Sequence, residues 1–168
     1  VGLSLEDLDL AMAVFSDSAD AARQWQALKA SAGSVSFEGI DGLDIGADTL
    51  TVQYNTAASG LAVVDFSGAH KFDVLVAPGE NVTLDMAGSE GRLLQAAGNV
   101  NLDVFGFVQL EGSFAIKKAD GDVTLAGGEE VAVNRMIIGG TVTSAFAGLN
   151  GGSDDALGME LSGVEFGL

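Results

Sequence analysis

The sequence predicts an all-β protein, a two-layer β-sandwich or flattened barrel with one short helix. Glycine occurs 24 times in 168 residues, whereas proline occurs once. Apolar and polar residues alternate along most of the chain, the period-2 pattern of strands with one buried face. Glycine and Asp or Asn separate the alternating runs at short intervals, as expected for tight turns. A β-roll or short solenoid is the alternative arrangement of the same strands.

The first fifteen residues predict a strand with an irregularity. Leu3 and Leu5 alternate with polar neighbours, and Leu8 and Leu10 resume the alternation one position out of step. Because a one-residue shift moves side chains to the other face of a sheet, a bulge is expected around Glu6-Asp7.

The period changes over residues 17–32, where the sequence predicts its one helix. Spacings of three and four would place the apolar residues on one helix face, packed against the sheet. Asp17 or Ser18 can cap the start of this helix and Gly33 can close its end. The residues of the expected apolar face are Ala21, Trp25, Leu28 and Ala32.

From Ser34 onward the sequence predicts strands almost to the end. A turn is expected over 117–122, around Asp120-Gly121, and a loop over 150–155. The runs expected to form strands are 34–55, 62–66, 71–76, 82–86, 92–97, 99–116, 123–125, 130–138, 141–146 and 157–168.

Charge and composition exclude several partners. Seven Lys and Arg face 24 Asp and Glu, a formal net charge of −17. Such a surface repels nucleic-acid phosphates and anionic lipids. No run of 18 apolar residues is present, so we expect neither a nucleic-acid partner nor membrane insertion. With no cysteine, disulfides and thiolate catalysis are excluded as well.

The two ends of the chain resemble each other at an offset of 156 residues. A chain whose last strand repeats its first is what a tandem array yields when it is cut slightly longer than one period. The sequence is therefore interpreted as a single domain, 1–168, holding about one period. The matching pairs are Gly2/Gly158, Leu3/Met159, Leu5/Leu161, Leu8/Val164, Asp9/Glu165, Leu10/Phe166 and Met12/Leu168.

Four phrases resemble a tandem repeat of about this length found in giant multidomain bacterial surface proteins. Those proteins are often grouped with large adhesins and repeat-in-toxin-like proteins. The resemblance implies an extracellular spacer or adhesive module at the bacterial cell surface, and it assigns no functional residues. The phrases are ARQWQALKASAG at 22–33, GIDGLDIGADTLTVQYN at 39–55, NLDVFGFVQLEGSFAI at 101–116 and VTSAFAGLNGG at 142–152.

Catalytic patterns are weak, and we expect the chain not to be an enzyme. His70 is the only histidine and lies in a polar turn, so a Ser–His–Asp triad would have to use it. One Trp and one Tyr do not predict an aromatic sugar cleft. Abundant carboxylates leave a glycosidase-like pair open, so hydrolysis ranks third among the functions considered.

Calcium is the one cofactor that the sequence could accommodate. Oxygen-bearing residues cluster at 17–20, at 120–122 and at 150–155, and calcium takes six to eight oxygen ligands. Asn150, Asp154 and Asp155 are the favoured ligands. Asp and Asn are also ordinary turn residues, which explains the same clusters without a metal.

The favoured function is that of a rigid acidic spacer, stacked many times to project or assemble an adhesive fibre. Its partners would be neighbouring copies, joined end to end through 2–12 and 158–168, with self-association of single units into filaments. The alternative is a glycan- or protein-binding module. A contiguous exposed apolar patch would favour binding, whereas polar faces with complementary ends would favour the spacer.

Overall fold

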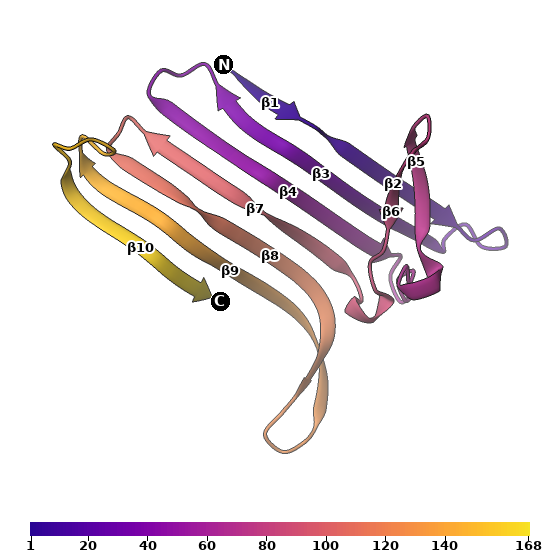
Figure 1. The fold of residues 1–168 in the computed structure, drawn as a ribbon. Helices are drawn as coiled ribbons and strands as arrows, with labels where there is room; N and C mark the ends of the chain where they lie inside the picture. The colour runs from indigo at the N-terminus through magenta and orange to yellow at the C-terminus, as the bar shows by residue number, and fades with distance from the viewer.

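The computed structural model describes all of residues 1–168. Its elements are β1 (Gly2–Glu6), β2 (Asp9–Ser16), β3 (Gln24–Glu38), β4 (Leu43–Ala57), the 3-10 turn η1 (Gly68–His70), β5 (Phe72–Ala77), β6 (Glu80–Leu84), the 3-10 turn η2 (Gly88–Glu90), β7 (Leu93–Val104), β8 (Val108–Thr124), β9 (Glu130–Leu149) and β10 (Leu157–Gly167). One large antiparallel sheet has the order β1-β3-β4-β7-β8-β9-β10, and β2 continues β1 along the same edge of β3 (Figure 1).

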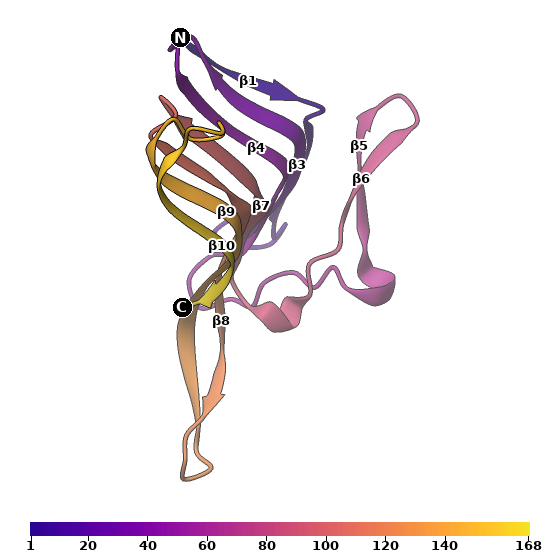
Figure 2. The same cartoon turned by 60° about the vertical axis from the view of Figure 1, so that its left-hand side comes forward.

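A second layer is formed by the hairpin β5-β6, which stands over one face of the large sheet near β2 and β3 (Figure 2). The predicted all-β, two-layer class is confirmed in this form. Only 12 of 168 residues are buried, and the one core cluster lies between the two layers. Its buried members are Ala11, Ala27, Phe66, Leu84, Met86, Leu93 and Ala119.

The helix predicted over 17–32 is wrong, because most of that segment lies in β3. Trp25 and Leu28 lie on opposite faces of this strand, and the Trp25 indole N–H donates to the carbonyl of Ala62 at 2.9 Å. Asp17 caps no helix; its carboxylate accepts the N–H of Ala19 in a local turn. The alanines of this stretch fit both periods, and hydrogen bonding to β2 and β4 on either side selects the strand.

The strands at the C-terminal half are longer than predicted. The turn expected over 117–122 is wrong: β8 continues through Asp120-Gly121, and the reversal falls at 125–129. Residues 130–138 and 141–146 belong to one strand, β9. The ends of β8 and β9 project beyond the large sheet as a hairpin (Figure 2). Residues 62–66, expected to be a strand, form an irregular connection to η1.

One face of the large sheet is apolar from edge to edge. Residues directly opposite each other in neighbouring strands share a face, so the register defines rows of side chains. Two rows of this apolar face are Leu3, Phe37, Ile45, Leu102, Leu110, Ala145 and Leu161, and Leu10, Ala30, Val52, Ala96, Ile116 and Ile138.

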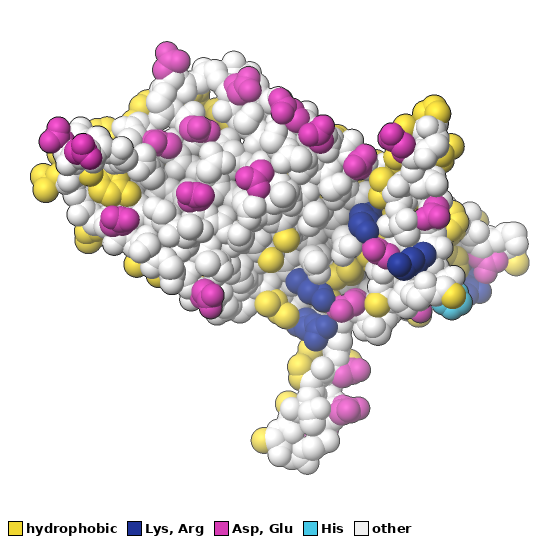
Figure 3. Space-filling view, in the orientation of Figure 1, with side chains coloured by type: hydrophobic (Ala, Val, Ile, Leu, Met, Phe, Trp, Pro, Cys, Tyr) yellow, Lys and Arg dark blue, Asp and Glu magenta, His cyan; other side chains and the backbone are white.

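The opposite face is polar outside the area under β5-β6. Figure 3 shows this polar face, with acidic side chains spread over the large sheet and the Lys and Arg side chains gathered beside the small sheet. Two of its rows are Ser4, Ser36, Gly46, Asn101, Glu111, Ser144 and Ser162, and Glu6, Ser34, Asp48, Asn99, Ser113, Thr141 and Glu165.

Irregular residues in several strands keep the apolar residues on one face. Asp7 lies between β1 and β2 with φ 50°, Thr49 in β4 with φ 50°, and Gly163 in β10 with φ 63°. In β9, Thr143 is an extra residue in the register with β8. The break expected at Glu6-Asp7 is therefore present, although the pairing with β3 keeps its register across it. Each irregularity shifts the alternation by one position.

The protein contains no helix that is both long and apolar enough to cross a membrane.

Candidate functional site

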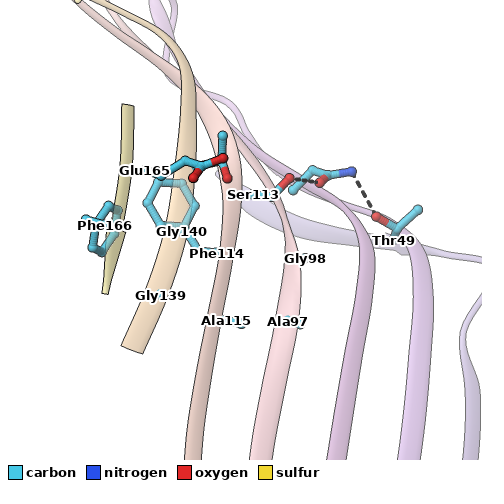
Figure 4. Close-up of a pocket in the computed structure, with 12 residues that line it drawn as sticks. Thr49, Ala97, Gly98, Ser113, Phe114, Ala115, Gly139, Gly140, Glu165 and Phe166 are labelled. Atoms are coloured by element: carbon cyan, nitrogen blue, oxygen red, sulfur yellow. Dashed lines mark hydrogen bonds between the residues drawn. The ribbon is translucent and has the colours of Figure 1, made fainter. Parts of the chain in front are cut away.

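The largest depression on the polar face is a trough of about 550 Å³ across β4, β7, β8, β9 and β10 (Figure 4). Its floor consists of the small residues Ala97, Ala115 and Gly139, which lie in one row of the sheet. Polar side chains, including Ser113 and Glu165, line its margin. The hollow forms because the side chains of this row are smaller than those of the rows beside it, and because no other part of the chain covers the row.

The polar groups at one side of the trough bond to each other. The Ser113 hydroxyl donates to Asn99 Oδ1 at 2.6 Å, and Asn99 Nδ2 donates to Thr49 Oγ1 at 3.0 Å and to Asp48 Oδ1 at 2.6 Å. Glu165 is the one charged residue in the lining. The trough therefore does not assemble the two carboxyl groups that glycoside hydrolysis uses.

His70 lies at the end of η1, exposed and outside the trough. Nearby, the Asp65 carboxylate accepts the backbone N–H groups of Gly88 at 2.8 Å and Ser67 at 3.0 Å. These two hydrogen bonds lower the pKa of Asp65, and the charge of His70 adds a smaller effect in the same direction. Asp65 thus ties the segments on either side of the small sheet together.

The predicted calcium ligands lie in the turn between β9 and β10. Asn150 has a left-handed backbone, φ 56°, and its side-chain amide donates to the carbonyl of Asp155 at 3.5 Å. The Ser153 hydroxyl donates to the Asn150 carbonyl at 2.8 Å, which closes the turn. Asp154 and Asp155 are exposed. Nowhere in the chain do three His, Cys, Asp or Glu side chains gather closely enough to hold a metal ion. Calcium binding at this turn stays a prediction.

The basic residues cluster where the large sheet meets the second layer. Glu90 in η2 pairs with Lys117 at 2.7 Å and with Arg135 at 3.4 Å, and Lys29 pairs with Asp85 at 2.8 Å. The hydrogen bond from Lys117 is the main cause of the lowered pKa of Glu90. These ion pairs connect the segments around β5-β6 to the polar face of the large sheet.

The two edges of the large sheet are open, and they hold the two segments that resemble each other. β1 and β2 form one edge and β10 forms the other, so 2–12 and 158–168 do not pair with each other (Figure 1). Unpaired edge strands present free N–H and C=O groups that can bond to another strand. Both edges are therefore candidate sites for association.

The apolar face is a surface that the sequence interpretation missed as a whole. Between the rows that begin at Leu3 and Met12 it contains no Asp or Glu, and Lys118 is its one charged residue. A hollow of about 470 Å³ on it is lined mainly by apolar residues, among them Leu102, Leu110 and Leu161. The apolar positions of each strand can be recognised from its alternation. At each irregular residue, however, the alternation shifts by one position, so the sequence does not show that all these positions lie on the same face.

The comparisons with known proteins give no relative: no family model matches the chain, and neither a curated protein nor a solved structure is significantly similar to it. The class that fold and surfaces define is an all-β module with a large open-edged sheet.

Proposed function

We propose that the chain is a structural repeat unit of a large extracellular bacterial surface protein, in which neighbouring units share one continuous sheet. In this arrangement the strand that closes one unit as β10 also opens the next unit as β1 and β2. The unit then serves as a rigid acidic spacer that projects or assembles an adhesive fibre. No catalytic activity is assigned to it.

The observation that carries the proposal is the direction in which the free backbone groups point. Leu168 exchanges two hydrogen bonds with Ile138 of β9, at 3.0 and 2.8 Å. Its equivalent 156 residues earlier is Met12. Asp17 N–H donates to the carbonyl of Arg23 at 3.0 Å, so odd-numbered residues of β2 face β3 and even-numbered residues such as Met12 face the open edge. One strand can therefore bond to β9 on one side and to β3 on the other.

Strand direction supports the same arrangement. Six successive antiparallel pairings separate the edge formed by β1 and β2 from β10. An even number of reversals makes the two edge strands run in the same direction, as a shared strand requires. With an odd number, β10 could not take the place of β1 and β2.

The register supports it as well. The row that starts at Leu3 ends at Leu161, and the row that starts at Leu10 ends at Leu168, which bonds to Ile138. At an offset of 156 residues, Leu3 is equivalent to Met159 and Leu10 to Phe166. Each row therefore ends two residues beyond the residue that is equivalent to its first member. The extra residue in β4 and the extra residue in β9 shift the register in opposite directions, so their effects cancel across the sheet. The rows on either side of the irregular residues are therefore displaced by the same two residues, and successive units can superpose.

The test is a chain of two periods, residues 1–156 followed by 1–168, compared with the single unit by small-angle X-ray scattering. Six strand spacings of about 4.8 Å predict that each period extends the sheet by about 29 Å. One cooperative unfolding transition is expected for the two-period chain, because the shared strand belongs to both units. Two independent transitions, with a flexible joint between compact units, would contradict the shared strand.

A protein-binding role is the second candidate, and the exposed apolar face is the observation that favours it.

A further inference from the structure

The molecule exposes far more surface than a folded chain of its mass requires. Its accessible surface is 10557 Å² for 17.0 kDa. A monomeric protein of this mass is expected to expose roughly 7,700 Å². The projecting β8-β9 hairpin, the small sheet and the uncovered apolar face all contribute exposed surface. Large side chains of this face, such as Leu94 and Met136, are about half exposed.

We propose that the apolar face docks onto the same face of a second copy of this chain, forming a sandwich of two large sheets. This inference is independent of the shared-strand arrangement, because it uses the face of the sheet and leaves both edges free. Sheets that pack face to face lie about 10 Å apart, with interleaved aliphatic side chains. The Leu, Val, Ile and Ala rows of this face have that composition.

The distribution of charge selects a second copy as the occupant. The chain has a net charge of −17, which would oppose self-association if carboxylates lay at the contact. They lie instead on the polar face, in the turns and in the segments around the small sheet. Two copies can therefore meet through rows that contain no carboxylate and a single cation, Lys118, while their carboxylates remain in water. The same acidity opposes docking onto an anionic lipid surface.

The area is sufficient for a stable pair. Six strand spacings of about 4.8 Å, and nine residues of about 3.3 Å between the rows of Leu3 and Met12, give a footprint of roughly 900 Å² on each copy. Specific protein–protein interfaces bury about 800 Å² on each partner. A two-fold axis that lies between the two sheets and parallel to them places this face against itself, so one surface serves both partners.

The first test compares adjacent residues on opposite faces of β8. Ile116 lies on the apolar face and Ala115 on the polar face, and both are exposed in the single chain. Light scattering of the full chain should give twice the mass of 17.0 kDa. Ile116→Glu should raise the dissociation constant of the pair about 100-fold or more, since a carboxylate would be buried without a partner. Ala115→Glu should leave it unchanged.

The second test uses the absence of cysteine and does not depend on the effect of a glutamate on folding. In Ile116→Cys the single thiol should be protected from a maleimide reagent in the pair and become reactive on dilution. In Ala115→Cys the thiol should react at one rate at all concentrations. Circular dichroism and urea unfolding check that each variant is folded.

Several results would overturn the proposal. A full chain that stays monomeric at millimolar concentration would do so, as would equal loss of association in the Ile116→Glu and Ala115→Glu variants. Association that continues beyond two copies and disappears only when 157–168 are removed would assign the contact to the edges. Binding to phosphatidylcholine vesicles that Ile116→Glu abolishes, with no pairing in solution, would assign the face to lipid.

Discussion

Asp7 and Gly163 hold the same left-handed backbone conformation, with φ values of 50° and 63°, at positions one period of 156 residues apart. Each interrupts its edge strand and leaves the register with the neighbouring strand unchanged. The residue types differ, so sequence similarity alone does not match these two positions. Their shared conformation is an independent structural indication that the two segments occupy equivalent places, as the shared-strand proposal requires.

Gly163 should be sensitive to the addition of a side chain, whereas Gly167 should not. An added Cβ meets open space at both positions, but only Gly163 has a positive φ. Gly163→Ala should lower the free energy of unfolding by about 1–2 kcal/mol, the cost of a left-handed residue with a side chain. Urea unfolding measures the loss. Equal effects of Gly163→Ala and Gly167→Ala would show that conformation at residue 163 is not the cause.

The attachment of the small sheet should depend on Leu84. This side chain at the end of β6 is fully buried against the large sheet, whereas Leu75 in β5 is 68% exposed. Leu84→Ala should lower the free energy of unfolding by about 2–5 kcal/mol, and Leu75→Ala should change it little. Thermal unfolding followed by circular dichroism separates the two. A small effect of Leu84→Ala would mean that the second layer contributes little to stability.

Glu90 should make stability depend on pH in the acidic range. Its pKa is lowered in the folded chain by the hydrogen bond from Lys117 and by the charges of Lys117 and Arg135. Ion pairing therefore stabilises the fold above the ordinary pKa of glutamate, and this contribution is lost as the pH falls through the lowered value. Wild type should lose more stability than Glu90→Gln between pH 7 and pH 3, as measured by urea midpoints.

A control for this prediction is Glu80, a glutamate on the exposed hairpin β5-β6 without an ion pair. Glu80→Gln should preserve the acid dependence of the wild type. If Glu90→Gln follows the wild-type curve as closely as Glu80→Gln does, the ion pairs of Glu90 do not contribute to folding.

Calcium binding at the turn between β9 and β10 has a direct thermal test. If Asn150, Asp154 and Asp155 bind the ion, the melting temperature should rise with calcium concentration, because a ligand of the folded state stabilises it by mass action. The double substitution of Asp154→Asn and Asp155→Asn should abolish that rise. An equal rise with sodium chloride would instead indicate screening of the net charge of −17.

Residue type and spacing are enough to predict the strand class and the sidedness of individual strands. In β7, for example, Leu94, Ala96, Val100 and Leu102 all lie at even positions, whereas the polar residues Gln95, Asn99, Asn101 and Asp103 lie at odd ones. Its apolar face therefore follows from the period alone. Composition alone shows the excess of carboxylates, and residue spacing alone shows that the two ends of the chain resemble each other. These are local properties, which depend on residue type and separation and not on what lies next to the strand.

Three other features depend on tertiary structure. Residues 24–32 contain alanines that fit a helix or a strand, and pairing with β2 and β4 made them a strand. The way in which Asp7, Thr49 and Gly163 keep one face apolar depends on the register of the whole sheet. The continuous apolar face required the same register, because each irregular residue changes the phase of its own strand. Long-range hydrogen bonding sets these relationships, and a pattern within one strand does not contain them.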